Sequence, residues 1–216
     1  MMEEIRIITE GGENEIEEKK SRFIATIRSV QDEQEALDLI ASMKKKYWNA
    51  THNCFAYIVG ERGQLKRCSD DGEPQGTAGR PMLSVLEGEH LTNVIAVVTR
   101  YFGGTLLGTG GLVRAYGRAV TEGLKSCRIM TRRDGFRLGI RTNYTDLGKL
   151  QYLLGQRGMQ ILESEYGEDV KTWILVPEED FDALTAVITE QTGGRAVYFE
   201  KEPLRFAVGG GEQVIL

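Results

Sequence analysis

The chain has 216 residues and a formal net charge of −5, with 41% apolar and 27% charged residues. This length and apolar content suit one large or two small globular domains with buried cores. The acidic total argues against non-specific nucleic-acid binding over the whole surface, so any such binding requires a local basic patch. The acidic N-terminal stretch lacks a signal-peptide core, and no apolar run reaches the roughly 18 residues of a membrane span.

The three cysteines, Cys54, Cys68 and Cys127, are odd in number and follow no framework spacing. This usage indicates reduced thiols and a cytoplasmic protein without a membrane partner.

The first part of the chain mixes strands and helices. Alternation and turn residues predict strands over 5–9, 14–20, 21–30, 53–60, 65–69 and 93–101. Helical periodicity predicts helices over 32–47, 78–86 and 112–125. The buried face of the first helix is expected to carry Leu37, Ile40, Met43 and Tyr47. Strand 93–101 is apolar almost throughout, which indicates a strand covered on both faces.

The second part follows the order β-α-β-β-α-β. Strands are predicted over 136–142, 160–166, 170–176 and 196–206, and helices over 145–157 and 177–190. This order is that of a ferredoxin-like unit. We therefore predict an α+β protein with two domains, residues 1–131 and 135–206, followed by a tail over residues 207–216 that is mobile at least at its glycines.

The strongest candidate site surrounds the glycine-rich loop at residues 103–111. Residues 90–121 contain no Asp or Glu. Glycines permit positive φ and outward-facing N–H groups, and the next helix adds the positive end of its dipole. Arginines on one face of that helix, and one at the end of the preceding strand, can grip an anion. The predicted anion or nucleic-acid site comprises Arg100, Gly103, Gly104, Gly108, Gly110, Arg114 and Arg118.

The loop lacks two standard nucleotide signatures. Thr109 stands where a Walker A loop requires lysine, and Val113 stands where a dinucleotide fingerprint requires its third glycine. Tight packing of loop against helix, with Arg118 paired to Glu122, is the alternative interpretation.

A second candidate site lies in the turn-rich stretch 69–79. Asp70, Asp71 and Glu73 offer carboxylates for a divalent cation or a general base, with Arg80 nearby in sequence. The spacing of a calcium loop is absent, so the alternative is a turn whose Asp side chains cap backbone N–H groups.

His52, Cys54 and Cys68 do not match a zinc spacing, and we interpret Cys54 as a small core residue. Trp48 and Trp173 are also expected in the core or at a domain contact, with a stacking platform as the alternative interpretation. We assign no catalytic residue, no metal ligand and no cofactor.

Five blocks resemble the IMPACT/YigZ family. They are KSRF at 20–23, HNC at 52–54, SDDGEP at 69–74, GRP at 79–81 and RYFGGxxxG at 100–108. The resemblance implies an N-terminal β-α fold like the second domain of a small-ribosomal-subunit protein, and a ferredoxin-like C-terminal domain. It also implies a link to translation, because eukaryotic members regulate translation by competing for a protein partner, whereas bacterial members have no settled activity.

Three functions remain open from the sequence. The first is a non-enzymatic, translation-associated protein that binds RNA or the ribosome through the glycine loop. The second is an enzyme acting on a phosphorylated or carboxylated small molecule. The third is a protein-interaction module with a protein partner.

Overall fold

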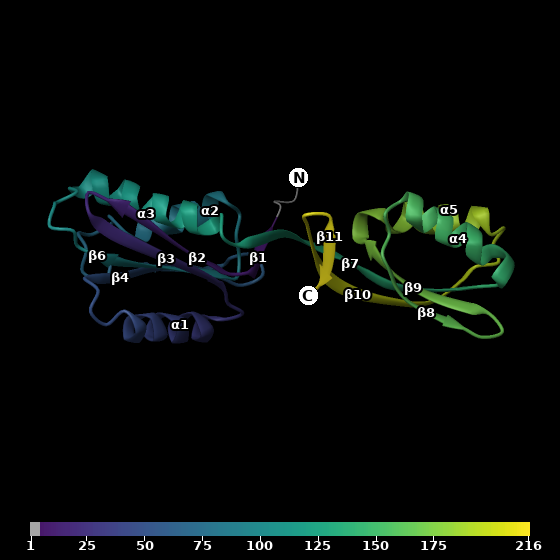
Figure 1. The fold of residues 1–216 in the computed structure, drawn as a ribbon. Helices are drawn as coiled ribbons and strands as arrows, with labels where there is room; N and C mark the ends of the chain where they lie inside the picture. The colour runs from purple at the N-terminus through teal and green to yellow at the C-terminus, as the bar shows by residue number, and fades with distance from the viewer. Residues whose placement is uncertain (1–4) are drawn as a thin grey trace. The chain divides into compact units, whose positions relative to one another are not determined.

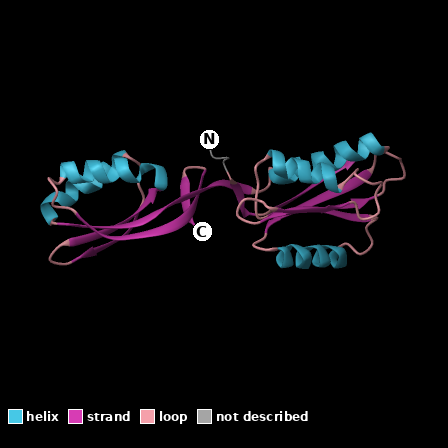
Figure 2. Ribbon diagram, turned by 180° about the vertical axis from the view of Figure 1, so that it is seen from behind, coloured by secondary structure: helices cyan, strands magenta, loops and turns pink. Residues whose placement is uncertain are grey.

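The computed structural model describes residues 5–216 and divides into two compact units, Met1–Thr131 and Arg132–Leu216. Helices and sheets are mixed in both units, which confirms the α+β class (Figures 1 and 2). Among the described residues, no helix combines the length and hydropathy needed to cross a membrane.

Unit 1 is built on one antiparallel sheet with the strand order β2-β3-β6-β4-β5. Its elements are β1 (Arg6–Glu10), β2 (Gly12–Glu18), β3 (Ser21–Ser29), α1 (Glu33–Lys46), β4 (His52–Val59), β5 (Leu65–Ser69), α2 (Gly79–Gly88), β6 (Val94–Tyr101) and α3 (Thr109–Leu124). The helices α2 and α3 cover one face of the sheet, and α1 covers the other (Figure 1). The central strand β6 is buried from Val94 to Arg100, which confirms that it is covered on both faces.

Each face of this sheet has its own core. Phe23, Val98 and Tyr116 belong to the core under α2 and α3, whereas Ile40 and Val97 belong to the core under α1. Because side chains alternate along a strand, neighbouring residues of β6 enter different cores. This alternation decides where Arg100 lies.

Two predictions about the α1 region were wrong. Leu37 is 46% exposed, because the buried face of α1 runs through Ala36 and Ile40 instead. Trp48 is 81% exposed, because the helix ends at Tyr47 and Trp48 enters the following loop. Trp173, in contrast, is only 7% exposed, as predicted.

Unit 2 has the chain order β7-α4-β8-β9-α5-β10 and the sheet order β11-β10-β7-β9-β8. Its elements are β7 (Arg128–Thr142), α4 (Tyr144–Gln156), β8 (Ile161–Tyr166), β9 (Val170–Pro177), a 3-10 turn (Glu178–Asp180), α5 (Phe181–Gln191), β10 (Val197–Gly209) and β11 (Glu212–Ile215). The first residues of β7 belong to unit 1, where they pair with β1. The ferredoxin-like arrangement is confirmed.

Residues 207–216 differ from the predicted tail. They complete β10, turn at Gly210 and Gly211, and return as β11, so that Phe206 pairs with Ile215. Both turn glycines have positive φ, 60° and 82°, which allows the tight reversal that joins two antiparallel strands. The glycines that suggested mobility are therefore the turn of a hairpin.

Candidate functional site

The carboxylate loop, residues 70–79, folds around the side chain of Asp70. Its carboxylate accepts hydrogen bonds from the backbone N–H groups of Gly76, Ala78 and Gly79 at 2.7–2.9 Å. Burial alone would raise the pKa of Asp70, but these three hydrogen bonds more than offset it and hold the pKa below its ordinary value. Asp70 thus caps backbone groups at the start of α2.

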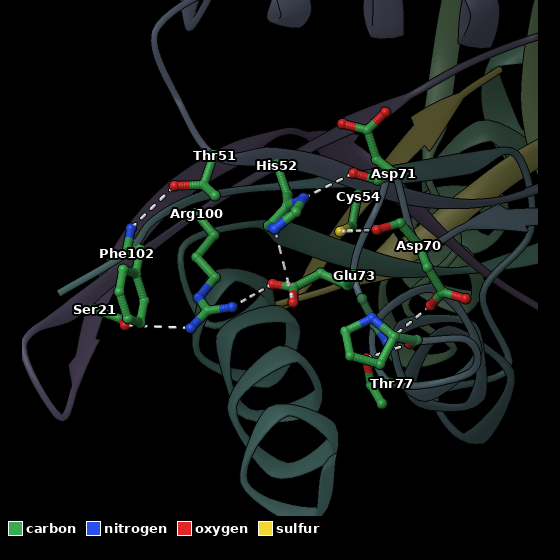
Figure 3. A network of polar contacts seen from close by, with 12 residues as sticks. Ser21, Thr51, His52, Cys54, Asp70, Asp71, Glu73, Thr77, Arg100 and Phe102 are labelled. Carbon is green, nitrogen blue, oxygen red and sulfur yellow. Dashed lines mark hydrogen bonds and ion pairs between the residues drawn. The ribbon is translucent and has the colours of Figure 1, made fainter. Parts of the chain in front are cut away.

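Asp71 ties the carboxylate loop to its surroundings. Its carboxylate accepts from the Asn53 backbone N–H at 2.7 Å and from Lys44 at 2.6 Å. The Nδ1 atom of His52 lies 2.8 Å from the Asp71 carbonyl oxygen (Figure 3). The loop is therefore fixed to both α1 and β4.

Glu73 and Arg100 form a buried ion pair that anchors the other side of the loop. Their side chains are 3% and 6% exposed, and Arg100 Nη1 lies 2.6 Å from Glu73 Oε1. The same oxygen accepts from the Tyr116 hydroxyl of α3 at 2.7 Å. His52 Nε2 lies 3.8 Å from Glu73 Oε2 (Figure 3). We call Glu73, Arg100, Tyr116, His52 and Ser21 the Glu73–Arg100 network.

Aromatic rings enclose the Arg100 guanidinium. It lies 5.4 Å from the ring centre of Phe23 and 5.7 Å from that of Phe102. Its Nη2 atom is 3.4 Å from the Ser21 hydroxyl, which also accepts from the Gly103 N–H at 3.1 Å. Arg100 is thus linked to the beginning of the glycine loop through the Ser21 hydroxyl.

Cys54 lies against this network as a neutral thiol. Its Sγ is 2.9 Å from the Asp70 carbonyl oxygen and 3.4 Å from the Tyr116 hydroxyl. Burial raises the pKa of Cys54 to about 12 and also raises the pKa of Tyr116, so both groups stay protonated at neutral pH. A thiol in this state is a poor nucleophile. Cys54 is fully buried, which confirms the core prediction.

The five sequence blocks that are far apart in the chain meet here. Ser21, His52, Glu73 and Arg100 come from four of them, and Gly79 of the fifth packs on the backbone of β5. The carboxylates are bound to groups of the protein itself. These contacts fit the alternative interpretation of the second candidate site, a turn whose Asp side chains cap backbone N–H groups. Within residues 5–216, Arg80 is exposed in α2 and forms no hydrogen bond or ion pair with these carboxylates.

The glycine loop is shorter than predicted, because α3 starts at Thr109 rather than at 112. Gly108, with φ 72°, caps the helix, and its carbonyl oxygen accepts from the Leu112 N–H at 2.9 Å. Gly110 therefore lies in the first helical turn. Within residues 5–216, no side chain caps this helix start, so its first N–H groups lack a side-chain acceptor there.

Beside the helix start lies a surface hollow of about 230 Å³. It is lined by Glu18, Lys19, Leu107, Gly111, Arg114, Ala115 and Arg118. We call the loop 103–111 together with these residues the glycine-loop surface. Lys19 comes from the β2–β3 turn, where Lys19 and Lys20 both have positive φ, and no local pattern in the sequence pointed to it.

The predicted arginines separate into two environments. Arg114 and Arg118 are exposed at the hollow, but Arg100 is buried with Glu73 and is not available to an anion there. Arg118 pairs with Glu18 at 3.5 Å rather than with Glu122, because the fold brings β2 beside α3. Arg114 has no ion-pair partner among residues 5–216.

Comparisons with known proteins agree with this architecture. A model of the Impact N-terminal domain matches residues 19–124, and a domain of unknown function, DUF1949, matches residues 140–195. The IMPACT family member YvyE of Bacillus subtilis is 44% identical over 195 residues, covering 90% of each chain. The chain belongs to the IMPACT family.

Solved structures also resemble this IMPACT family member. The crystal structure of a hypothetical protein aligns with 94% of this chain and 99% of that chain, at 33% identity and a TM-score of 0.58. The two-domain translational regulator Yih1 aligns with 55% of this chain and 48% of that chain. At 22% identity and a TM-score of 0.38, that second likeness is too remote to support an argument.

Proposed function

We propose that this IMPACT family member is a non-enzymatic, cytoplasmic regulator associated with translation, which binds RNA or the ribosome through the glycine-loop surface. One observation carries the proposal. The cations of this surface are open to solvent, whereas the groups expected to perform catalysis are bound to other groups of the protein.

The charge at the hollow favours a phosphate chain. Lys19, Arg114 and Arg118 surround it, and the only carboxylate among its lining residues is Glu18. The positive end of α3 points outward at the same place, and arginine binds phosphate oxygens in a planar fork. The described chain therefore offers a local basic site despite its acidic total.

Catalysis is the weaker candidate because the possible general bases are occupied. Glu73 Oε1 accepts from Arg100 and Tyr116, and Asp70 accepts from three backbone N–H groups. A general base needs to reach a substrate proton. The hollow of about 230 Å³ and its cationic lining keep an enzyme acting on a phosphorylated or carboxylated molecule as the second candidate.

The salt dependence of RNA binding tests the proposal. A single-stranded RNA of mixed sequence is titrated at several salt concentrations, and purified ribosomes are used in parallel. With a single strand, each arginine that contacts a phosphate contributes about 0.7 to the magnitude of the slope of log K against log salt. We expect Arg114→Ala and Arg118→Ala each to weaken binding and lower this slope.

Arg62→Ala is the matched control, because Arg62 is exposed in the β4–β5 turn of the same unit and its substitution removes the same positive charge. Equal loss in Arg62→Ala would show a general charge effect and refute the assigned site. Failure of the wild-type protein to bind RNA or ribosomes refutes the function. In that case, stabilisation by a phosphorylated metabolite in a thermal-shift assay would favour the enzyme, and a nuclease-resistant protein partner would favour an interaction module.

A further inference from the structure

Trp48 is an exposed aromatic residue whose position the fold does not explain. Its residue surface is 81% exposed, while the chain's other tryptophan, Trp173, is 7% exposed. Tryptophan normally buries a large apolar area and dominates the energetics of cores and interfaces. A tryptophan left in water therefore points to a binding role.

The loop that carries Trp48 is held in place rather than loose. The Ala50 N–H donates to the Tyr47 carbonyl at 3.0 Å, and the Thr51 N–H donates to the Arg100 carbonyl at 2.9 Å. The Tyr101 hydroxyl donates to the Asn49 side chain at 2.9 Å. Trp48 thus projects from a fixed backbone, so less entropy is lost when a ligand binds it.

Two basic side chains lie over aromatic rings at and beside this loop. The Lys46 ammonium lies 4.6 Å from the ring centre of Tyr47, and the Arg22 guanidinium lies 5.5 Å from that of Tyr101. Grooves for single-stranded nucleic acid combine basic side chains with aromatic stacking surfaces in this manner.

We propose that Trp48 stacks on an unpaired base of single-stranded RNA. This inference rests on the proposed function, since the glycine-loop surface would hold the phosphates of the same RNA. The two places are continuous: β6 runs from Arg100 and Tyr101 directly into the glycine loop, and the Phe102 N–H donates to Thr51 at 3.2 Å. Loop 47–51 and the glycine loop therefore meet at one end of the unit 1 sheet.

The surroundings of Trp48 favour a base over a protein surface. Protein hot spots lie at the centre of a desolvated apolar patch. Trp48 instead follows the basic end of α1, residues 44–46, and precedes Asn49. The carboxylates of Glu13 and Glu15 are balanced by the cations they pair with, Lys46 and Arg22.

The fluorescence of Trp48 gives a direct test. In a Trp173→Phe background Trp48 is the only tryptophan, so all tryptophan emission reports on it. Titration with single-stranded oligouridylate should quench this emission in proportion to binding. Trp48→Ala should weaken binding by about 5- to 150-fold, the range for loss of one stacked base, while the salt slope stays unchanged. Trp48→Phe should retain most of the affinity for single-stranded RNA. An RNA duplex, whose bases are already stacked, should bind Trp48→Ala and Trp48→Phe with equal affinity.

Tyr166→Ala is the control for loss of an exposed aromatic ring, because Tyr166 is 64% exposed in unit 2. If wild-type protein binds the RNA, but Trp48 emission in Trp173→Phe is not quenched and Trp48→Ala binds equally well, the stacking inference fails and the proposed function stands. If wild-type protein binds ribosomes but no single-stranded RNA, the stacking inference alone fails, and if it binds neither, both fail together. Loss of a nuclease-resistant protein partner in Trp48→Ala, with RNA binding intact, would assign Trp48 to a protein interface instead.

Discussion

Unit 1 contains two groups of charged residues that are close in sequence but differ in burial. In the Glu73–Arg100 network the ion pair is buried and hydrogen-bonded. At the glycine-loop surface, Arg114 and Arg118 are exposed and surround a hollow. The first group fixes the carboxylate loop, whereas the second is exposed to solvent, where we propose that it binds RNA. A recurrent sequence block can thus mark the scaffold of a site rather than its contacts.

Removing Arg100 should have the largest effect on stability. In Arg100→Ala, the Glu73 carboxylate stays buried without its cation, and breaking such a buried pair costs about 3–5 kcal/mol. Urea unfolding followed by circular dichroism measures this change. Arg114→Ala is the matched control, because an exposed arginine should change stability by at most about 0.5 kcal/mol. Equal losses of unfolding free energy in Arg100→Ala and Arg114→Ala would contradict the assignment of a structural role to Arg100 alone.

Gly103→Ala should have the next largest effect, because the loop packs directly on the β2–β3 turn. A Cβ atom at Gly103 would lie 2.0 Å from the Lys20 carbonyl carbon, which is backbone and has no room to move aside. Overpacking of this kind costs about 1–3 kcal/mol. The unfolding free energy of Gly103→Ala should fall accordingly.

Gly110→Ala is the comparison for that variant. Its Cβ would meet only the flexible end of Arg114 at 3.5 Å, and Gly110 lies within α3. Alanine in a helix is favoured over glycine by about 0.5–1 kcal/mol, so this variant should be as stable as wild type or more stable. Destabilisation of Gly110→Ala to the level of Gly103→Ala would contradict the packing explanation.

Asp70 connects stability to pH. Its pKa lies below 3.8, the ordinary value, so its contribution to stability is complete above the unfolded-state pKa and is lost as pH falls through the folded-state pKa. Asp70→Ala should cost about 0.5–2 kcal/mol at pH 7, the usual cost of replacing a capping Asp by Ala. The gap between wild type and variant should narrow below about pH 4, where the wild-type carboxylate becomes protonated. A gap that is constant from pH 7 to pH 3 would argue against this assignment.

Local patterns in the sequence predicted the order of elements well. Asp32 was expected at the start of the first helix and indeed caps α1. The hairpin over 207–216 and the early start of α3 were missed, because runs of glycine indicate mobility or a helix break until their φ angles are known. The exposure of Trp48 was missed because periodicity gives no information beyond the helix end.

The partners of charged side chains were the least predictable part of the candidate site. Arg118 meets Glu18, which is far away in sequence, and Tyr116 joins Glu73 from the face of α3 that a pattern assigns to the core. Such contacts depend on how β2, α3 and the carboxylate loop pack together. Composition showed that the glycine loop lacks acids nearby in sequence, but it could not show the carboxylate that the fold brings to it.

Glu18 therefore provides a test that acts on the glycine-loop surface alone and has the smallest expected effect on stability. Glu18→Gln removes the carboxylate at the hollow and releases Arg118, whose pair with Glu18 is solvent-exposed at 3.5 Å. Stability should change by less than about 1 kcal/mol, as for other surface ion pairs. RNA affinity should rise and its salt slope should steepen by up to about 0.7, because one more cation can contact a phosphate of the single strand. Glu10→Gln is a suitable control, since Glu10 pairs with Arg128 outside the hollow. If Glu18→Gln weakens RNA binding instead, Glu18 orients Arg118 for binding rather than competing with the ligand.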